Sequence, residues 1–362
     1  MKSRLPRDIL FFGSDEFSVT CCRRLLQSAR EGIVGRLEIV TPPDQPRTKQ
    51  PEGENAVALK TSQTQQSNAV ALKRFARENG IANHVAPPKT LIGWTVIPPP
   101  SQFDLACVVS FGYFVPKSVI RAFPLAALNV HPSLLPKYRG AAPIQHTILN
   151  GDSVTGVTIQ ELDEKQFDAG RILHQSSMEA GPYPFYKELH DRLARQGAED
   201  LVKTVANLEE YKVNATVQDS SAITHARKIS KDSAAIHWES MTRERIYALH
   251  RALGYKASGS LPAGTALTIP LYSEFRGKRT QLLAMSLEIV PAIVPADAAT
   301  RPAGSVFYDK ATETIFVKCA DGLIGVTEVK VQGKKELGAK WFENGYQLKF
   351  DDRFESALIS TE

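Results

Sequence analysis

Apolar runs and stretches of helical periodicity alternate near the start of the chain. Residues 8–13 form a short apolar run that ends in glycine, residues 16–30 place apolar side chains at helical spacing, and residues 36–40 have the pattern of a second strand. Ser14 or Asp15 can cap the helix, since a short polar side chain there accepts a hydrogen bond from a free backbone N–H. A strand, a helix and a strand in close succession predict a βαβ unit and a parallel sheet.

Four further segments extend this pattern. Residues 105–110 and 126–131 are apolar runs of strand length, residues 115–122 show a short helical pattern, and residues 187–207 form the longest helical stretch. The sequence therefore predicts an α/β, Rossmann-like domain with a mostly parallel sheet over residues 1–211.

The pattern changes in the remainder of the chain. A helical stretch near residues 242–253 precedes short apolar segments that are separated by turns with glycine or proline. These segments are residues 266–269, 281–284, 305–308, 314–318 and 323–331. Short strands at this spacing favour a small antiparallel barrel or sandwich, and we expect an OB-like β-barrel. We expect this second domain over residues 212–362, because a chain of 362 residues exceeds the roughly 250–300 residues of a single core.

Residues 42–66 interrupt the alternating pattern. The segment is rich in Pro, Gln, Thr, Glu and Lys and has almost no large apolar side chain. It is typical of a long surface loop, and such loops are commonly functional or disordered. The hexapeptide NAVALK occurs at residues 55–60 and again at residues 68–73, which we interpret as a chance duplication because one repeat does not make a repeat protein.

Composition and charge narrow the classes of protein. A hydrophobic share of 43% and a charged share of 23% are typical of a folded chain. The sequence has no run of about 18 apolar residues, so no membrane span is predicted. The net charge is +5, and residues 226–350 hold 18 Lys and Arg against 12 Asp and Glu, which suits an anionic partner. The spacing of the cysteines indicates neither a disulfide framework nor a zinc site; they are Cys21, Cys22, Cys107 and Cys319.

The segment that carries chemistry is LNVHPSLLPKYRGAAPIQHTILNG, residues 128–151. Asn129 and His131 end an apolar run two residues apart, so both side chains project to the same side of a strand. The carboxyl end of a parallel strand is where open α/β sheets bind ligands. A rigid turn over residues 132–136 and a small-residue segment with Arg139 follow directly. Taken alone, Asn and His at a strand end are as often structural as functional.

The stretch NVHPSLLPKYRGAAPIQ resembles the signature of the 10-formyltetrahydrofolate-dependent formyltransferases, and YRGAAPIQ is similar to the branch that formylates methionyl-tRNA. Further similar blocks span nearly the whole chain. They are ILFFGSDEFS at 9–18, VVSFGYFVP at 108–116, GDSVTGVTI at 151–159, FDAGRIL at 167–173 and ARKISKDSAAIHW at 226–238. The proline in NVHPS resembles the mitochondrial members, whereas NVHGS is common in bacterial members.

The resemblance implies a catalytic set of Asn129, His131 and Asp168. Asp168 stands in FDAG as the family's aspartate does, and Asp163 and Glu164 are the rival carboxylates. In formyl transfer an amine attacks the formyl carbon on N10 of the folate, and a negatively charged oxygen develops. Asn129 would donate an amide N–H to this oxygen, a protonated His131 would stabilise it and supply a proton to N10, and Asp168 would orient His131.

The resemblance also implies a folate site. Its expected members are Phe111, Gly112, Ser133, Leu134, Leu135 and Pro136. Core packing explains Phe111 and Phe114 equally well. No G-x-G-x-x-G follows the first predicted strand, which argues against a dinucleotide. The formyl donor is expected to be 10-formyltetrahydrofolate, with no metal.

The partner that the resemblance implies is initiator Met-tRNA, whose phosphates would contact Lys and Arg. The candidate tRNA contacts are Arg47, Lys49, Lys60, Arg139, Arg276, Lys278, Arg279, Lys334 and Lys335. A charged run is more often a solvated face, and the loop over residues 42–66 lacks the compact Arg-Gly-Lys-Lys cluster of bacterial members. We expect a monomer in the mitochondrial matrix, or in the cytoplasm if the source is bacterial.

Two alternatives compete with this function. A family member could use the same donor to formylate a small amine, or could transfer the formyl group to water. YRGAAPIQ and the basic second domain favour tRNA instead. A non-catalytic RNA-binding protein on the same fold would be expected to have lost Asn129, His131 or Asp168, and all three are present.

Overall fold

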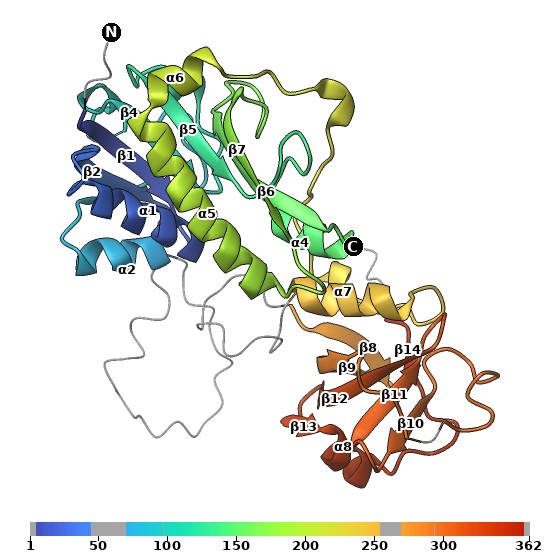
Figure 1. The fold of residues 1–362 in the computed structure, drawn as a ribbon. Helices are drawn as coiled ribbons and strands as arrows, with labels where there is room; N and C mark the ends of the chain where they lie inside the picture. The colour runs from blue at the N-terminus through green and yellow to red at the C-terminus, as the bar shows by residue number, and fades with distance from the viewer. Residues whose placement is uncertain (1–4, 45–69, 97, 254–268, 293, 358–362) are drawn as a thin grey trace, which may run out of the picture. The chain divides into compact units, whose positions relative to one another are not determined.

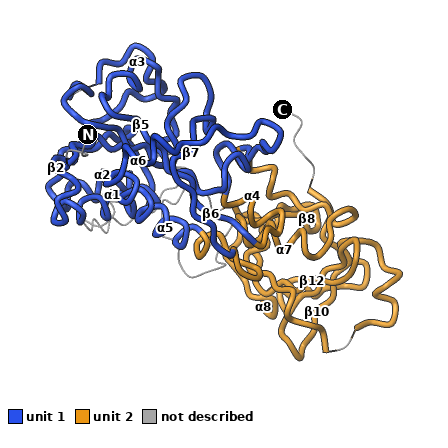
Figure 2. Tube along the Cα trace, turned by 45° about the horizontal axis from the view of Figure 1, so that its top comes forward, with its two compact units in different colours: residues 1–143, 154–179, 190–227 blue, residues 144–153, 180–189, 228–362 orange. Residues whose placement is uncertain are grey.

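The computed structural model describes residues 5–44, 70–96, 98–253, 269–292 and 294–357 (Figure 1). The chain forms two compact units, coloured blue and orange in Figure 2. The first unit comprises residues 1–143, 154–179 and 190–227, and the second comprises residues 144–153, 180–189 and 228–362. The domain boundary expected between residues 211 and 212 stays a prediction.

The first unit is built on a seven-stranded sheet in the order β3-β2-β1-β4-β5-β6-β7. Its strands are β1 (Arg7–Gly13), β2 (Val34–Thr41), β3 (Asn83–Val85), β4 (Leu105–Val109), β5 (Ala126–His131), β6 (Val154–Glu161) and β7 (Ile172–Glu179). Neighbouring strands from β3 to β5 in this order pair in parallel, whereas β6 pairs antiparallel with both β5 and β7. The predicted mostly parallel α/β sheet is therefore confirmed.

Helices cover one face of this sheet, as Figure 1 shows. They are α1 (Glu16–Ser28), α2 (Ala71–Glu78) and α5 (Tyr186–Ala206). Asp15 caps α1 by accepting a hydrogen bond from the backbone N of Ser18 at 3.1 Å. Gly197 lets α5 approach the sheet closely, because a Cβ there would lie 2.9 Å from Cγ1 of Val130.

An apolar core surrounds Leu10 and Phe12 of β1, which are fully buried. Residues between 86 and 123 close it, including Val119 in the short helix α3 (Lys117–Ile120). A parallel sheet that is buried on both faces needs continuous apolar strands. This requirement explains why β1, β4 and β5 could be predicted from apolar runs alone.

The second unit contains an antiparallel sheet in the order β10-β11-β12-β9-β8-β14, with β13 paired to β12. Its strands are β8 (Leu271–Phe275), β9 (Lys278–Ser286), β10 (Val306–Asp309), β11 (Thr314–Lys318), β12 (Leu323–Val331), β13 (Glu336–Gly338) and β14 (Phe354–Glu355). Helices α7 (Arg243–Leu253) and α8 (Ala339–Tyr346) belong to this unit. The predicted antiparallel sheet with a preceding helix is confirmed.

The antiparallel sheet does not close through a ladder of paired strands over the described residues. β10 and β14 end the strand order, and a single antiparallel bridge joins Ser305 to Arg353 just before them. The closed, OB-like barrel stays a prediction.

Two short segments from the middle of the chain belong to the second unit. Nη1 of Arg245 donates a hydrogen bond to the carbonyl O of Leu149 at 2.9 Å, at the end of α4 (Pro143–Leu149). Nη1 of Arg251 donates to the carbonyl O of Pro184 at 3.1 Å. Both arginines lie on α7, so this helix fixes the two segments to the unit.

Some sequence predictions fall outside the described residues. These include residues 45–66 of the predicted loop, the first copy of NAVALK and residues 266–268 of one predicted strand. The second copy of NAVALK is partly helical, since Ala71–Lys73 begin α2. All four cysteines are buried free thiols. Within the described ranges, no helix is both long enough and apolar enough to cross a membrane.

Candidate active site

The strand β5 presents Asn129 and His131 at the carboxyl end of the parallel part of the sheet. It lies between β4, which is parallel to it, and β6, which is antiparallel. In this register Asn129 is opposite Gln160, and His131 is opposite Thr158. The two candidate side chains therefore reach the same side of the strand, as their spacing predicts.

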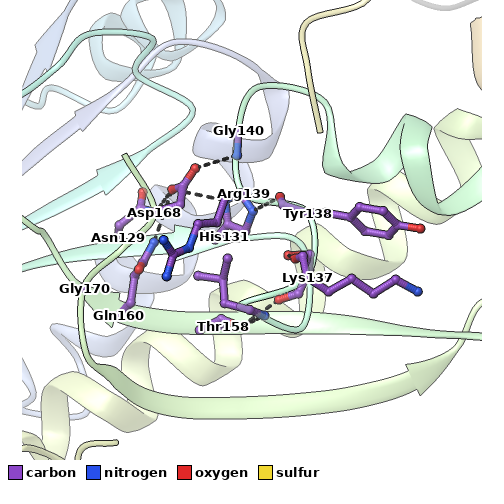
Figure 3. Close-up of polar contacts among 12 residues, drawn as sticks. Asn129, His131, Lys137, Tyr138, Arg139, Gly140, Thr158, Gln160, Asp168 and Gly170 are labelled. Atoms are coloured by element: carbon purple, nitrogen blue, oxygen red, sulfur yellow. Dashed lines mark hydrogen bonds and ion pairs between the residues drawn. The ribbon is translucent and has the colours of Figure 1, made fainter. Parts of the chain in front are cut away.

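Asp168 meets this pair from the loop between β6 and β7 (Figure 3). Its Oδ1 accepts hydrogen bonds from Nδ2 of Asn129 at 3.3 Å and from Nε2 of Gln160 at 3.2 Å. Nδ1 of His131 lies 3.4 Å from the same oxygen. Its Oδ2 accepts a hydrogen bond from the backbone N of Gly140 at 2.9 Å. The structure thus brings together all three residues expected to be catalytic.

The ring of His131 has an oxygen partner at each nitrogen. Nε2 lies 2.9 Å from the carbonyl O of Tyr138, and Nδ1 faces Asp168. A carbonyl oxygen can only accept a hydrogen bond, so Nε2 carries the proton in this contact. At Nδ1 the partner is a carboxylate, whose oxygens also accept hydrogen bonds. The residue is 4% exposed, so water competes little with these contacts.

The rival carboxylates are occupied by other groups. Oδ1 of Asp163 accepts hydrogen bonds from the backbone N of Lys165 and of Gln166, both at 2.8 Å. Glu164 pairs with Arg121 at 2.5 Å and with Lys117 at 3.5 Å. The hydrogen bond from Arg121 and the nearby positive charges hold the pKa of Glu164 below its ordinary value.

A cavity of about 470 Å³ adjoins the three candidate residues. Asn129, His131 and Asp168 line it, together with Phe111, Gly112 and other residues of the same unit. Aromatic pairs shape its wall: the ring centroids of Phe111 and Tyr113 are 4.9 Å apart, and those of Phe114 and Phe167 are 5.2 Å apart. A volume of this size falls within the roughly 300–1,000 Å³ of small-molecule sites.

Phe111 serves the core and the cavity at once. It is 3% exposed and contacts Phe12 edge-on at a centroid distance of 5.3 Å, yet it also lines the cavity. The two explanations offered by the sequence for Phe111 are therefore compatible. Gly112 has a φ of +79°, a left-handed conformation that glycine adopts without strain.

Ser133, Leu134, Leu135 and Pro136, the other residues expected at the folate site, are not among the residues that line the cavity. They are fixed to β6 instead. Oγ1 of Thr158 donates a hydrogen bond to the carbonyl O of Ser133 at 2.7 Å. The same Oγ1 accepts a hydrogen bond from the backbone N of Leu135 at 3.1 Å. This segment holds Pro132, which does line the cavity.

Among the expected tRNA contacts, Arg139 lies in the first unit beside the catalytic set. Its Nε and Nη2 donate to Oε1 of Gln218 at 2.9 and 2.7 Å. Arg47, Lys49 and Lys60 lie outside the described residues.

The other expected tRNA contacts lie in the second unit. Lys278, Lys334 and Lys335 line one hollow, whereas Arg279 lines another with Lys231 and Lys330. The guanidinium of Arg279 also covers the ring of Tyr272, 3.5 Å from its centroid. Arg276 is neutralised by a two-pronged contact with Asp352, at 2.8 Å from Nε and 2.6 Å from Nη2. The structure therefore groups the three lysines at one hollow, whereas the charge of Arg276 is compensated by Asp352.

Three polar contacts of the site are not indicated by any pattern in the sequence. Gln160 and the backbone N of Gly140 bind the carboxylate of Asp168, and Gln218 binds the loop that carries it. An isolated glutamine carries no sequence signal, and Gln218 is 50 residues from Asp168. The described residues contain no group of three or more His, Cys, Asp or Glu side chains that could hold a metal ion.

Two family profiles match the chain. The profile named Formyl transferase matches residues 94–205, and the profile named Formyl transferase, C-terminal domain, matches residues 228–347. Over 352 residues the chain is 33% identical to "Methionyl-tRNA formyltransferase, mitochondrial" of Homo sapiens, covering 96% of this chain and 79% of the relative. It is 30% identical to the methionyl-tRNA formyltransferase of Methylococcus capsulatus, covering 94% and 97%.

Solved structures share the fold at low identity. HypX from Aquifex aeolicus, in complex with tetrahydrofolic acid, gives a TM-score of 0.56 at 15% identity over 96% of this chain and 50% of HypX. The N-formyltransferase of Helicobacter canadensis, in complex with folinic acid and dTDP-3-aminofucose, gives 0.53 at 15% identity over 88% and 98%. The chain thus spans about half the length of HypX.

Proposed function

This chain belongs to the formyl transferase family, and we propose that it transfers the formyl group of 10-formyltetrahydrofolate to the amino group of methionine on initiator Met-tRNA. The relatives from Homo sapiens and Methylococcus capsulatus, which match 96% and 94% of this chain, are methionyl-tRNA formyltransferases. Both family profiles match, one in each half of the chain. The protein is accordingly an enzyme of translation initiation.

The convergence of Asn129, His131 and Asp168 on one cavity carries the proposal. Oδ1 of Asp168 lies 3.3 Å from Nδ2 of Asn129 and 3.4 Å from Nδ1 of His131, and all three residues line the cavity. An amide donor, an imidazole and a carboxylate in contact provide a hydrogen-bond donor, an acid and a base in one place.

Each of these groups has a task in formyl transfer. The amine of methionine forms a bond to the formyl carbon, the bond from that carbon to N10 breaks, and one proton moves from the amine to N10. One Nδ2 hydrogen of Asn129 binds Asp168, which leaves the other for the negative charge that develops on the formyl oxygen. Asp168 accepts the proton of the amine, and His131 gives a proton to N10. Their contact then returns the proton from Asp168 to His131.

The cavity suits the folate donor. Its volume of about 470 Å³ and its aromatic wall fit a flat, partly apolar ring system. Phe111 and Gly112 are proposed to contact the folate directly. Ser133–Pro136 are proposed to act one step away, by holding Pro132 in the cavity wall.

The second unit is proposed to bind the tRNA. Residues 226–350 carry 18 Lys and Arg against 12 Asp and Glu, and three candidate lysines share one hollow. In this proposal residues 1–211 hold the folate and the aminoacyl end, and residues 212–362 form a barrel-like tRNA-binding domain. We further propose a monomer in the mitochondrial matrix, in keeping with the mitochondrial relative; a bacterial source would place it in the cytoplasm.

A formyl-transfer assay tests this function. The protein is mixed with 10-formyltetrahydrofolate and charged initiator Met-tRNA, and formyl-methionine is released from the tRNA and quantified. A dTDP-amino sugar, glycinamide ribonucleotide and buffer alone replace the tRNA in parallel reactions. Formylation of Met-tRNA above all other acceptors supports the proposal. Turnover only with a small amine or with water would instead identify a family member of different specificity.

A further inference from the structure

The side chain of Gln218 joins two parts of the site that are distant in sequence. It is 8% exposed and lies in the segment that follows α6 (Leu208–Val213). Its Nε2 donates hydrogen bonds to the carbonyl O of Asp168 at 2.9 Å and to that of Gly170 at 2.8 Å. Its Oε1 accepts the two hydrogen bonds from Arg139 at 2.9 and 2.7 Å.

These partners allow only one orientation of the amide. A guanidinium only donates and a carbonyl only accepts, so the oxygen of Gln218 must face Arg139 and its nitrogen must face the loop. A third contact, from Nε2 to Oε1 of Gln160 at 3.2 Å, links the amide to a residue that itself binds the carboxylate of Asp168. Both hydrogens and the carbonyl oxygen of Gln218 are thus used inside the site.

The loop that carries Asp168 needs such a contact. Asp168 has a φ of +55°, in the left-handed region that few residues other than glycine adopt, although aspartate is among those that do. A conformation of this kind persists only where the surroundings determine it. Two residues later the backbone passes so close to β6 that a Cβ on Gly170 would lie 1.7 Å from the carbonyl O of Glu161. Gln218 binds the carbonyl groups of Asp168 and Gly170, which belong to this turn.

The backbone around Gln218 is fixed at both ends. An antiparallel bridge pairs Thr216 with Ile172 on β7, and a parallel bridge pairs His225 with Arg139. Gly140, the residue after Arg139, also lies close to the segment that carries Gln218, since a Cβ on Gly140 would lie 2.7 Å from the carbonyl O of Ala226. The segment that carries Gln218 is therefore attached both to β7 and to the backbone of Arg139, the two parts of the site that Gln218 connects.

We propose that Gln218 is a positioning residue for formyl transfer, one that holds the turn of Asp168 against Asn129 and His131. This role rests on the proposed function of the site. Because a neutral amide rather than a carboxylate binds Arg139, this pair of side chains carries a net positive charge. Gln218 consequently serves the turnover step through the turn and the binding of the anionic tRNA through Arg139.

Two substitutions separate these roles. Gln218→Met keeps the length of the side chain and removes both sets of hydrogen bonds. We expect kcat to fall about tenfold or more, since a small displacement of a catalytic group has effects of this size. The KM for Met-tRNA should rise severalfold, and the KM for 10-formyltetrahydrofolate should stay unchanged. Gln218→Glu keeps an oxygen for Arg139 but turns a second oxygen toward the two carbonyl groups, so its kcat should fall at least as far.

Gln196→Met is the matched control. Nε2 of Gln196 donates to Oδ1 of Asp200 at 3.0 Å on α5, so this variant also loses a partly buried amide donor of the first unit. Its kcat should stay at the wild-type value. Thermal unfolding of all variants shows whether each is folded at the assay temperature.

Hydrogen exchange at the backbone N of Gly140 gives a readout that does not depend on activity. This N–H donates to Oδ2 of Asp168, so its exchange should accelerate in Gln218→Met and stay slow in Gln196→Met. A Gln218→Glu protein with wild-type kcat, or unchanged exchange at Gly140 in Gln218→Met, would overturn the positioning role. An inactive wild-type protein would instead contradict the proposed function, and the exchange experiment would still decide the role of Gln218.

Discussion

His131 and His250 are equally buried histidines with opposite surroundings. Each is 4% exposed, and one lies in each compact unit. The ring of His131 faces two oxygens, the carbonyl O of Tyr138 and Oδ1 of Asp168. The ring of His250 stacks on Tyr247 at a centroid distance of 6.2 Å. Burial, and secondarily the positive charge of the neighbouring arginine, lower the pKa of His250 from 6.5 to about 4.

The comparison shows that burial alone does not make a histidine chemically useful. Removing a ring from water favours its neutral form, as at His250. At His131 the two ring nitrogens face oxygens from two loops that the sheet brings to one edge. At His250 the helix α7 supplies an aromatic ring and the cation of Arg251 instead. We therefore interpret His131 as a reacting group and His250 as a neutral packing residue.

The largest effect is expected from replacing His131. His131→Ala should lower kcat for Met-tRNA formylation about a thousandfold, the middle of the range for loss of an acid–base group. His250→Phe fills a similar volume in an aromatic environment and should leave kcat essentially unchanged. Steady-state kinetics of both variants measure the difference. Equal losses in the two would refute the distinction between the histidines.

A smaller loss is expected when the charge of Asp168 is removed. Asp168→Asn keeps the size of the side chain but replaces one acceptor by a donor, and we expect kcat to fall about a hundredfold. Asp200 offers a matched control, since its Oδ1 lies 3.2 Å from Nε2 of His174, outside the cavity. Asp200→Asn should lower stability and leave kcat near wild type. If Asp168→Asn and Asp200→Asn had similar kcat values, the contact between Asp168 and His131 would have no catalytic role that the contact between Asp200 and His174 lacks.

The depressed pKa of His250 makes stability depend on pH. The folded pKa of about 4 lies below the unfolded value near 6.5, so the unfolded chain binds the proton first as pH falls. The contribution of neutral His250 is complete above about pH 6.5 and is lost progressively toward pH 4, by up to about 3 kcal/mol. Urea unfolding at several pH values should show this loss in the wild type and a smaller one in His250→Phe. Identical pH profiles would indicate that the ring of His250 is not kept neutral by its surroundings.

The strand that carries the site could be predicted to the residue. The apolar run over residues 126–131 is β5, because a strand buried on both faces has a continuous apolar sequence. The hairpin of β6 and β7, which returns Asp168 to this strand, was not predicted. β7 carries serine and glutamine and has one buried position, Leu173, while its later positions alternate between half-buried and exposed. β6 contains Gly156, where a Cβ would lie 2.1 Å from the carbonyl O of Ser176. Asp168 was therefore accessible only through the family resemblance.

The polar frame around Asp168 could not be predicted in either way. Gln160 and Gln218 are single glutamines without a periodic pattern, and their value depends on a fold that places them side by side. The same limit applies to Arg276, which the sequence groups with Lys278 and Arg279. A carboxylate 76 residues away neutralises it, and no local pattern shows this. Sequence patterns report neighbours along an element, whereas these contacts depend on how distant elements meet.

The smallest effect is expected in the second unit, where the charges act on a partner rather than on a reacting bond. Lys334 and Lys335 line a hollow with Lys278, whereas Arg276 pairs with Asp352. Replacing Lys334 and Lys335 by Ala should raise the KM for Met-tRNA severalfold, leave kcat unchanged, and reduce the slope of log KM against log salt by about one for each phosphate that the protein no longer neutralises. Arg276→Ala should change the slope much less, because its charge is already compensated within the unit. If Arg276→Ala had the larger effect on the salt dependence, the tRNA would bind by displacing Asp352, and the candidate surface would have to be moved from the lysines to that ion pair.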